Sequence, residues 1–192
     1  MSTSLLLLYI QGYKIIKHWH EGSLNTSFGI TAGLGHKLAI EYKDFSPRSK
    51  ETNYADITTF NTKLTIKEYN VLYKLNKNIS VFTGVAQVKG TQAISGNADT
   101  DGGSASTQNK NIWQLGLVGT APIAEKTTAF AATAVGSNLI AYKLGVSYEI
   151  VRNVGMDVYY SYNQYKNLQW ESDNGQSDFT AKGLGYGITY RF

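Results

Sequence analysis

Residues 138–150 read NLIAYKLGVSYEI, and large apolar side chains occupy every second position along them. These apolar positions are Ile140, Tyr142, Leu144, Val146, Tyr148 and Ile150. Small or charged residues lie between them, at Ala141, Lys143, Gly145, Ser147 and Glu149. Because successive side chains of a β-strand point to opposite faces, this alternation predicts a strand with one apolar face.

The same alternation recurs along the chain and predicts an all-β fold. It is clear in VGMDVYYSYNQY (154–165) and in WQLGLVGTA (113–121). Applied throughout, it predicts ten strands, at 5–16, 24–34, 38–45, 62–75, 79–94, 111–123, 127–135, 139–150, 154–168 and 179–192. Within the first and fifth of these, LLLLYI (5–10) and ISVFTGVAQV (79–88) are apolar on both faces. Merging the second strand with the third and the seventh with the eighth gives an eight-strand alternative.

Composition supports one β-rich domain spanning residues 1–192. The chain has 14 Tyr and 19 Gly but only 2 Pro, and 17% of its residues are charged, below the ~25% usual in soluble proteins. The absence of Cys excludes disulfides, thiolate metal sites and cysteine nucleophiles. The net charge of +4 is spread along the chain, so we expect no nucleic-acid partner.

No apolar run reaches the ~18 residues of a membrane-spanning helix. The run Leu5–Ile10 is too short and lacks the flanking features of a signal peptide. If the protein is exported, we expect its signal peptide to have been removed.

The predicted connections alternate in length. Short ones, such as GHK (35–37) and VRN (151–153), alternate with long polar ones, such as 46–60 and 96–110. Short connections therefore gather at one end of the structure and long ones at the other, with GSN (136–138) as the exception.

The apolar faces are too large to fill the lumen of a single ten-stranded barrel, so they point outward or pack between two sheets. A soluble β-sandwich is the second possibility. Three features favour an outward apolar face over a sandwich. They are the unequal loop lengths, the glycines on the polar face, and the aromatic level formed by Tyr73, Tyr148 and Tyr190. We therefore expect a closed antiparallel transmembrane β-barrel.

These features resemble the bacterial outer-membrane β-barrel proteins, which share an even strand number, short periplasmic turns, long external loops, aromatic girdles and a C-terminal aromatic residue. The resemblance implies a place in the outer membrane of a Gram-negative cell, with outer-membrane lipids and lipopolysaccharide as neighbours. It also implies a C-terminal assembly signal that the outer-membrane insertion machinery reads, here Tyr186, Ile188, Tyr190 and Phe192.

The alternation assigns side chains to the two faces of the expected barrel. Those expected to face lipid are Leu115, Leu117, Leu144, Val146, Tyr148, Val158, Tyr160, Leu184 and Ile188. Those expected to line the lumen are Lys14, Lys74, Gln114, Lys143, Glu149, Asp157, Tyr159, Asn163 and Arg191. Opposite charges could pair in a plugged interior, or the polar lining could surround a narrow water-filled passage.

We expect no catalytic residue, metal or cofactor. The omptin proteases also have ten strands, but they need a His beside a carboxylate. Here His36 lies in a tight turn, and His18 and His20 have no Asp beside them, although Glu21 follows. A calcium loop at Asp99 and Asp101 would lack its twelfth-position Glu.

The lysines near the predicted long-loop ends are candidate ligands for glycolipid phosphates or simply solvated bases: Lys17, Lys43, Lys89, Lys110, Lys166 and Lys182. Together these features predict a narrow pore or a structural surface protein. The alternative is an adhesin or partner-binding module that uses its long loops, with an unknown subunit or host molecule as partner. An outer-membrane enzyme is a third, less favoured class.

Deletion of Phe192 separates recognition by the insertion machinery from stability. In a finished barrel the loss of one interfacial ring has a modest effect, because Tyr73, Tyr148 and Tyr190 remain. We predict that the deleted chain reaches the outer membrane in lower amounts, yet refolds in detergent to a form with heat-modifiable gel mobility. Normal insertion in cells would contradict the assembly signal.

Overall fold

The computed structural model describes residues 5–12, 14–15, 24–49, 52–54, 58–96, 102–172 and 175–191. These residues form strands, turns and bends and contain no helix. None of the described segments is therefore a helix long and apolar enough to cross a membrane.

The described residues contain ten long strands and three short ones. The long strands are β1 (Leu5–Gly12), β3 (Leu24–Gly35), β4 (Leu38–Phe45), β6 (Thr58–Lys74), β7 (Ile79–Gly96), β9 (Lys110–Ala124), β10 (Thr127–Gly136), β11 (Leu139–Val151), β12 (Val154–Gln169) and β13 (Gln176–Arg191). The short strands are β2 (Lys14–Ile15), β5 (Thr52–Tyr54) and β8 (Gly103–Ser106).

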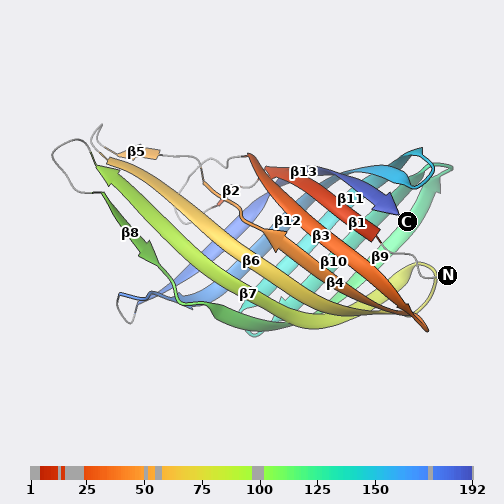
Figure 1. Ribbon diagram of the computed structural model, residues 1–192, viewed down its shortest axis with the longest axis horizontal. Coiled ribbons are helices and arrows are strands. Elements are labelled where there is room, and N and C mark those ends of the chain that lie inside the picture. Colours follow the sequence, from red (N-terminus) through yellow and green to blue (C-terminus); the bar gives the residue numbers. More distant parts are fainter. Residues whose placement is uncertain are drawn as a thin grey trace.

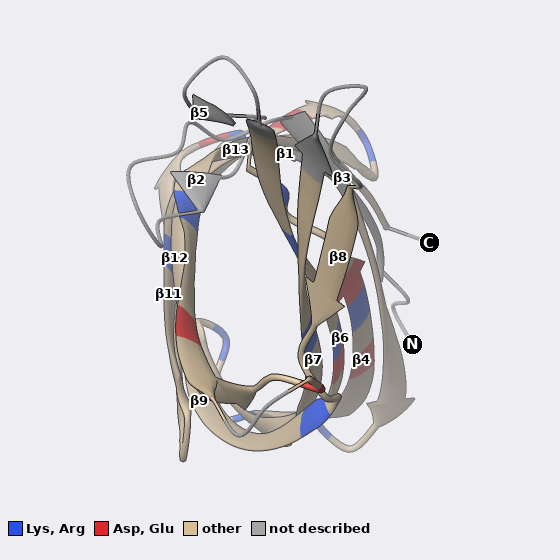
Figure 2. Cartoon of the chain, turned by 90° about the vertical axis from the view of Figure 1, so that its left-hand side faces the viewer, with Lys and Arg blue, Asp and Glu red and all other residues tan. Residues whose placement is uncertain are grey.

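The long strands form one antiparallel sheet in the order β6-β4-β3-β1-β13-β12-β11-β10-β9-β7. Strand β6 also pairs with β7 along its whole length, from Thr58↔Gly96 to Lys74↔Ser80. Each long strand therefore has two paired neighbours, and we call these ten strands the ring. Figure 2 looks at the ring from the end that carries β5 and β8.

The strands of the ring are tilted. Following cross-strand partners from Gly33, near the short-turn end of β3, leads round to Ile15, which pairs with Ala181 near the opposite end of the structure. In Figure 1 the strands accordingly run obliquely across the molecule. Such a stagger is what an antiparallel sheet needs in order to curve back on itself.

The predicted all-β antiparallel fold and its ten strands are confirmed, and the eight-strand alternative is wrong. Most predicted boundaries agree with the observed ones within two residues, but β6 and β13 begin earlier than predicted, at Thr58 and Gln176, and β1 ends at Gly12 rather than at residue 16. Strands β5 and β8 lie in segments predicted to be loops. They pair with the long-loop ends of β6 and β7, respectively.

The tight turn between β3 and β4 has an unusual backbone. His36 and Lys37 have φ angles of 47° and 69°, and Gly35 has a φ of 83°. Two successive positive φ values are typical of the two-residue hairpin turns whose twist matches that of the strands. Asn153, with a φ of 72°, has a similar place between β11 and β12.

Candidate functional site

The outer face of the ring is apolar over most of its height. All nine residues predicted to face lipid are exposed, from Tyr160 at 37% to Leu184 at 69%. On β11 the apolar positions run from Ile140 to Ile150, a length of ~33 Å at ~3.3 Å per residue. A strand tilt of about 40° reduces this to ~25 Å, the height of the apolar band on a transmembrane barrel. Contact of these side chains with lipid remains a prediction.

Aromatic side chains gather toward the long-loop edge of this apolar face. Tyr42 and Tyr69 are cross-strand partners whose ring centroids lie 5.1 Å apart. Trp113, on β9, is 71% exposed. Farther round the ring, Tyr142 stacks on Tyr162 with centroids 4.9 Å apart. Tyr and Trp favour such positions where an apolar medium meets water.

Just beyond this aromatic edge, the polar and apolar faces of β6, β7 and β9 exchange sides: polar residues point outward and apolar residues point inward. The cross-strand partners Lys67, Gln87 and Asn111 lie on the outer face, two residues beyond Tyr69, Val85 and Trp113. The inward neighbours of this polar row are apolar and completely buried: Ile66, Val88 and Ile112. From this level toward the long loops, these three strands therefore carry polar residues outside and buried apolar residues inside.

The inward side chains at this end form a core that we call the apolar plug. One wall contributes Leu64, Ile66, Val88 and Ile112, and the facing wall contributes Leu139, Tyr165, Leu168, Phe179 and Ala181. All nine are at most 2% exposed. A Cβ atom added to Gly90 on β7 would lie 2.9 Å from the Phe179 ring of β13, so the two walls are in direct contact.

Segments from both walls also join across this end of the ring. Residues Thr107 and Trp170 form a β-bridge. On either side of it, the Gln108 amide donates to the Gln169 carbonyl at 2.8 Å and the Glu171 amide to the Ser106 carbonyl at 2.9 Å. The Lys89 ammonium lies 2.9 Å from the Glu171 carboxylate. These contacts close the described backbone over the plug.

Closer to the short-turn end the interior is polar, in a group that we call the polar layer: Glu41, Lys43, Glu68, Asn70 and Gln114. The Lys43 ammonium lies 2.7 Å from the Glu41 carboxylate and 3.7 Å from that of Glu68. Asn70 donates to Glu41 at 3.0 Å, and Gln114 donates to Asn70 at 2.8 Å. Paired in this way, the charges reduce the cost of their burial.

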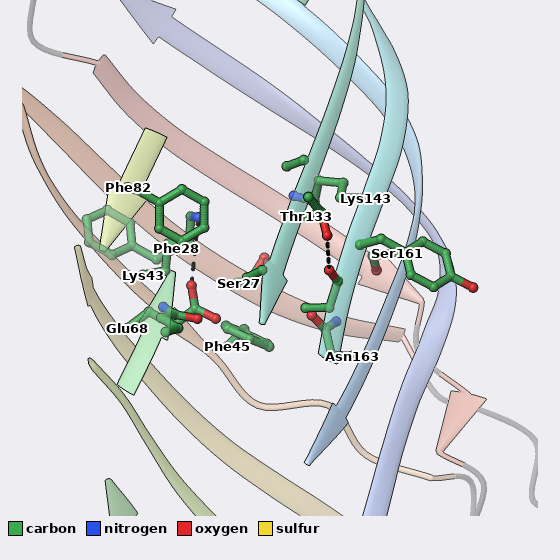
Figure 3. A pocket seen from close by; sticks show the side chains of 15 residues that line it. Ser27, Phe28, Lys43, Phe45, Glu68, Phe82, Thr133, Lys143, Ser161 and Asn163 are labelled. Atoms are coloured by element: carbon green, nitrogen blue, oxygen red, sulfur yellow. Dashed lines mark hydrogen bonds and ion pairs between the residues drawn. The ribbon is translucent and has the colours of Figure 1, made fainter. Parts of the chain in front are cut away.

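A cavity of about 100 Å³ lies beside the polar layer, and Lys43, Glu68 and Gln114 are among the residues that line it. Figure 3 shows Lys43 and Glu68 on one side of it, and Lys143, Ser161 and Asn163 on the other. The Lys143 ammonium lies 3.9 Å from the centre of the Tyr159 ring, in cation–π geometry. The cavity is large enough for a few water molecules.

Aromatic rings fill the interior opposite glycines. A Cβ atom on Gly116 would lie 2.2 Å from Cζ of Phe82, and one on Gly145 would lie 2.7 Å from Cζ of Phe130 and 2.5 Å from Cβ of Tyr159. Glycine is required at these positions because the rings occupy the space that a side chain would need.

The structure distributes the predicted lumen residues over several environments. Gln114, Asp157 and Tyr159 are buried, with Asp157 accepting a 2.5 Å hydrogen bond from Thr189. Lys143 and Asn163 line the cavity, whereas Lys74 and Glu149 are exposed. The side chains of Lys14 and Arg191 lie outside the described set. Their assignment to a lumen stays a prediction.

The predicted group of long-loop lysines needs one correction. Lys43 does not belong to it, because its ammonium lies in the polar layer. Lys89 pairs with Glu171, and Lys110 donates to the carbonyls of Lys166 and Asn167. Lys17 lies outside the described residues.

The residues considered above for catalysis or for a calcium loop also lie outside the described residues: His18, His20, Glu21, Asp99 and Asp101. The same holds for Phe192. His36 is exposed in its turn. Within the described ranges, no three His, Asp or Glu side chains are grouped to hold a metal ion.

No protein-family model matches the chain, and no curated protein matches its sequence. Solved structures do match its fold. The outer membrane protease OmpT from Escherichia coli aligns with a TM-score of 0.58 at 10% identity, over 100% of this chain and 93% of that one. Ail, the attachment invasion locus protein of Yersinia pestis, in complex with the heparin analogue sucrose octasulfate, gives 0.54 at 12% identity, with coverages of 100% and 98%.

The translocator domain of the autotransporter NalP from Neisseria meningitidis gives a TM-score of 0.54 at 13% identity, with coverages of 100% and 87%. At such low identity these similarities concern the fold alone. The chain has the fold of the bacterial outer-membrane β-barrel proteins, as its sequence pattern predicts.

Substitution of Gly90 tests the contact between the two walls of the plug. We predict that Gly90→Ala destabilises the folded protein by about 1 to 3 kcal/mol, because the added methyl group overlaps the Phe179 ring. The urea midpoint of unfolding in detergent measures this. In a Phe179→Leu background the same substitution should cost much less.

Gly103→Ala is the matched control, because a Cβ atom there meets nothing within 4 Å. An equal loss of stability for the Gly90 and Gly103 variants would contradict the packed plug.

Proposed function

We propose that the chain is an integral protein of the bacterial outer membrane, a closed ten-stranded transmembrane barrel with a solid interior. It acts as a structural, surface-exposed protein. The observation that carries this proposal lies on β6, β7 and β9. Within two residues along each strand, the apolar side chains pass from the outer face of the ring to its inner face. A strand changes its apolar face in this way where the medium outside changes from hydrocarbon to water.

Closure of the barrel is supported by the pairing of every ring strand with two neighbours. Hydrocarbon offers no hydrogen bonds to an unpaired strand edge, so a sheet that spans a bilayer needs such pairing on both sides. The long-loop end, which carries the plug together with β5 and β8, faces outward, and the short turns face the periplasm (Figure 1).

A plugged interior fits the packing better than a pore does. The plug is dry and apolar, the charges of the polar layer are paired, and rings fill the space opposite Gly116 and Gly145. Of the two sequence-based readings of the lumen, the geometry favours the paired and filled one.

The surface above the membrane is the part available to other molecules. Strands β5, β6, β7 and β8 continue there as a four-stranded sheet. Its outer face carries Lys63 and Lys67, and these ammonium groups would attract the phosphates of neighbouring lipopolysaccharide. Ail, with a similar fold, is seen with a sulfated heparin analogue, so an adhesin that binds polyanions is the second candidate.

We propose no catalytic role, cofactor or metal. The similarity to OmpT concerns the fold, and His36 lies in a turn at the short-turn end. The terminal residues Tyr186, Ile188, Tyr190 and Phe192 remain our proposed signal for the insertion machinery.

Two adjacent residues on β11 test the orientation of the ring. We predict that Val146→Arg destabilises the protein in a bilayer by about 2 to 4 kcal/mol, because the charge would enter hydrocarbon near the midplane. Ser147→Arg, on the opposite face, should retain insertion into lipid. Urea unfolding in lipid vesicles measures both, and equal tolerance of the two arginines would rule out the assignment.

Conductance tests the solid interior. In a planar bilayer the refolded protein should give no steady single-channel current, because the plug blocks the passage of hydrated ions. A stable ohmic conductance in heat-modifiable, correctly folded protein would favour the pore instead.

A further inference from the structure

Each of the four short turns at one end of the ring carries one cation. They are Lys37 between β3 and β4, Lys77 between β6 and β7, Lys126 between β9 and β10, and Arg152 between β11 and β12. We call these four residues the turn cations. All four are exposed, and Lys74 at the end of β6 is a fifth exposed cation at this end.

Acidic groups are few at this end of the described chain. The turns and adjoining strand ends carry Glu125 and Glu149, but none of the turn cations forms an ion pair or a side-chain hydrogen bond with a described residue. Toward the other end, Lys43 and Lys89 are paired with carboxylates and Lys110 with backbone carbonyls, whereas Lys63 and Lys67 form no ion pair with a described residue. The charges of the short turns are therefore available to an outside anion.

The turn cations lie at a defined depth. They come directly after the aromatic level of Tyr73, Tyr148 and Tyr190, each of which is between 42% and 47% exposed on the outer face. Interfacial tyrosines mark the level of lipid headgroups, and long basic side chains beside them extend toward the phosphates. This step rests on the proposed function, since it requires the apolar face to span a bilayer.

We propose that the turn cations bind the phosphate groups of anionic phospholipids in the leaflet at the short-turn end. Ammonium and guanidinium groups bind phosphate through charge-assisted hydrogen bonds. Each one near an anionic membrane surface also adds a favourable electrostatic attraction. The four turns join strand pairs that are spaced around the ring, so the turn cations are separated from one another. This spacing suits several small anions arranged around the protein better than one compact acidic partner.

The test compares two variants of the same four positions. The turn variant combines Lys37→Gln, Lys77→Gln, Lys126→Gln and Arg152→Gln, which removes the charges. The control variant combines Lys37→Arg, Lys77→Arg, Lys126→Arg and Arg152→Lys, which keeps a positive charge at each position. Each protein is refolded into phosphatidylcholine vesicles with and without phosphatidylglycerol, and the urea midpoint of unfolding is measured from the heat-modifiable band.

We expect phosphatidylglycerol to raise the midpoint of the unchanged protein, and high salt to remove this rise because it screens exposed charges. The turn variant should lose most of the rise, and the control variant should keep it. An equal rise in both variants, or no rise in the unchanged protein, would overturn the proposal. A rise with soluble polyglutamate but not with phosphatidylglycerol would also overturn it, in favour of an acidic polymer.

A second measurement on the unchanged protein does not depend on folding of the turn variant. Spin-labelled phosphatidylglycerol should be immobilised at the protein surface in a larger fraction than spin-labelled phosphatidylcholine, and salt should remove the difference. Insertion with equal immobilisation overturns this inference alone. Failure to insert into either vesicle overturns the proposed function as well.

Discussion

Hydrogen bonding of the backbone is the constraint on which the rest of this structure depends. A sheet in an apolar medium has no water to satisfy a free edge, so each strand needs a neighbour on both sides. The ring meets this requirement through the pairing of β1 with β13 and of β6 with β7. Once the backbone is satisfied in this way, side chains are free to follow the medium that each face meets.

In the proposed orientation, the apolar side chains of a strand point outward where hydrocarbon surrounds the ring and inward where water does. Around Tyr69 the apolar residues of β6 point outward, whereas at Leu64 and Ile66 they point inward and pack against the opposite wall. In the proposed orientation, one continuous strand therefore faces the membrane near Tyr69 and, farther along, belongs to a core like that of a soluble sandwich. Glycines such as Gly90 and Gly116 permit the filling, because rings from other strands occupy their side-chain space.

Much of this could be predicted from the sequence, because a period of two is a local signal. The ten strands and the exposed face of β11 follow from it directly. The plug does not, since contacts such as Gly90 with Phe179 join residues far apart in the chain. The sequence signal for it is that residues 79–88 are apolar on both faces. The sequence does not predict strand β8, because GSAS has no apolar alternation. It places Lys43 near a strand end, but only the structure shows that the Lys43 ammonium lies inside the ring beside Glu41.

A cysteine scan of residues 63–73 tests whether β6 passes from hydrocarbon to water between Tyr69 and Lys67. The chain has no native Cys, so each position can carry one spin label whose accessibility to oxygen and to a water-soluble nickel complex is measured in vesicles. We predict access to oxygen at positions 69, 71 and 73, access to nickel at 63, 65 and 67, and access to neither reagent at 64 and 66. Nickel access at 64 and 66, or oxygen access continuing through 67 to 63, would contradict it.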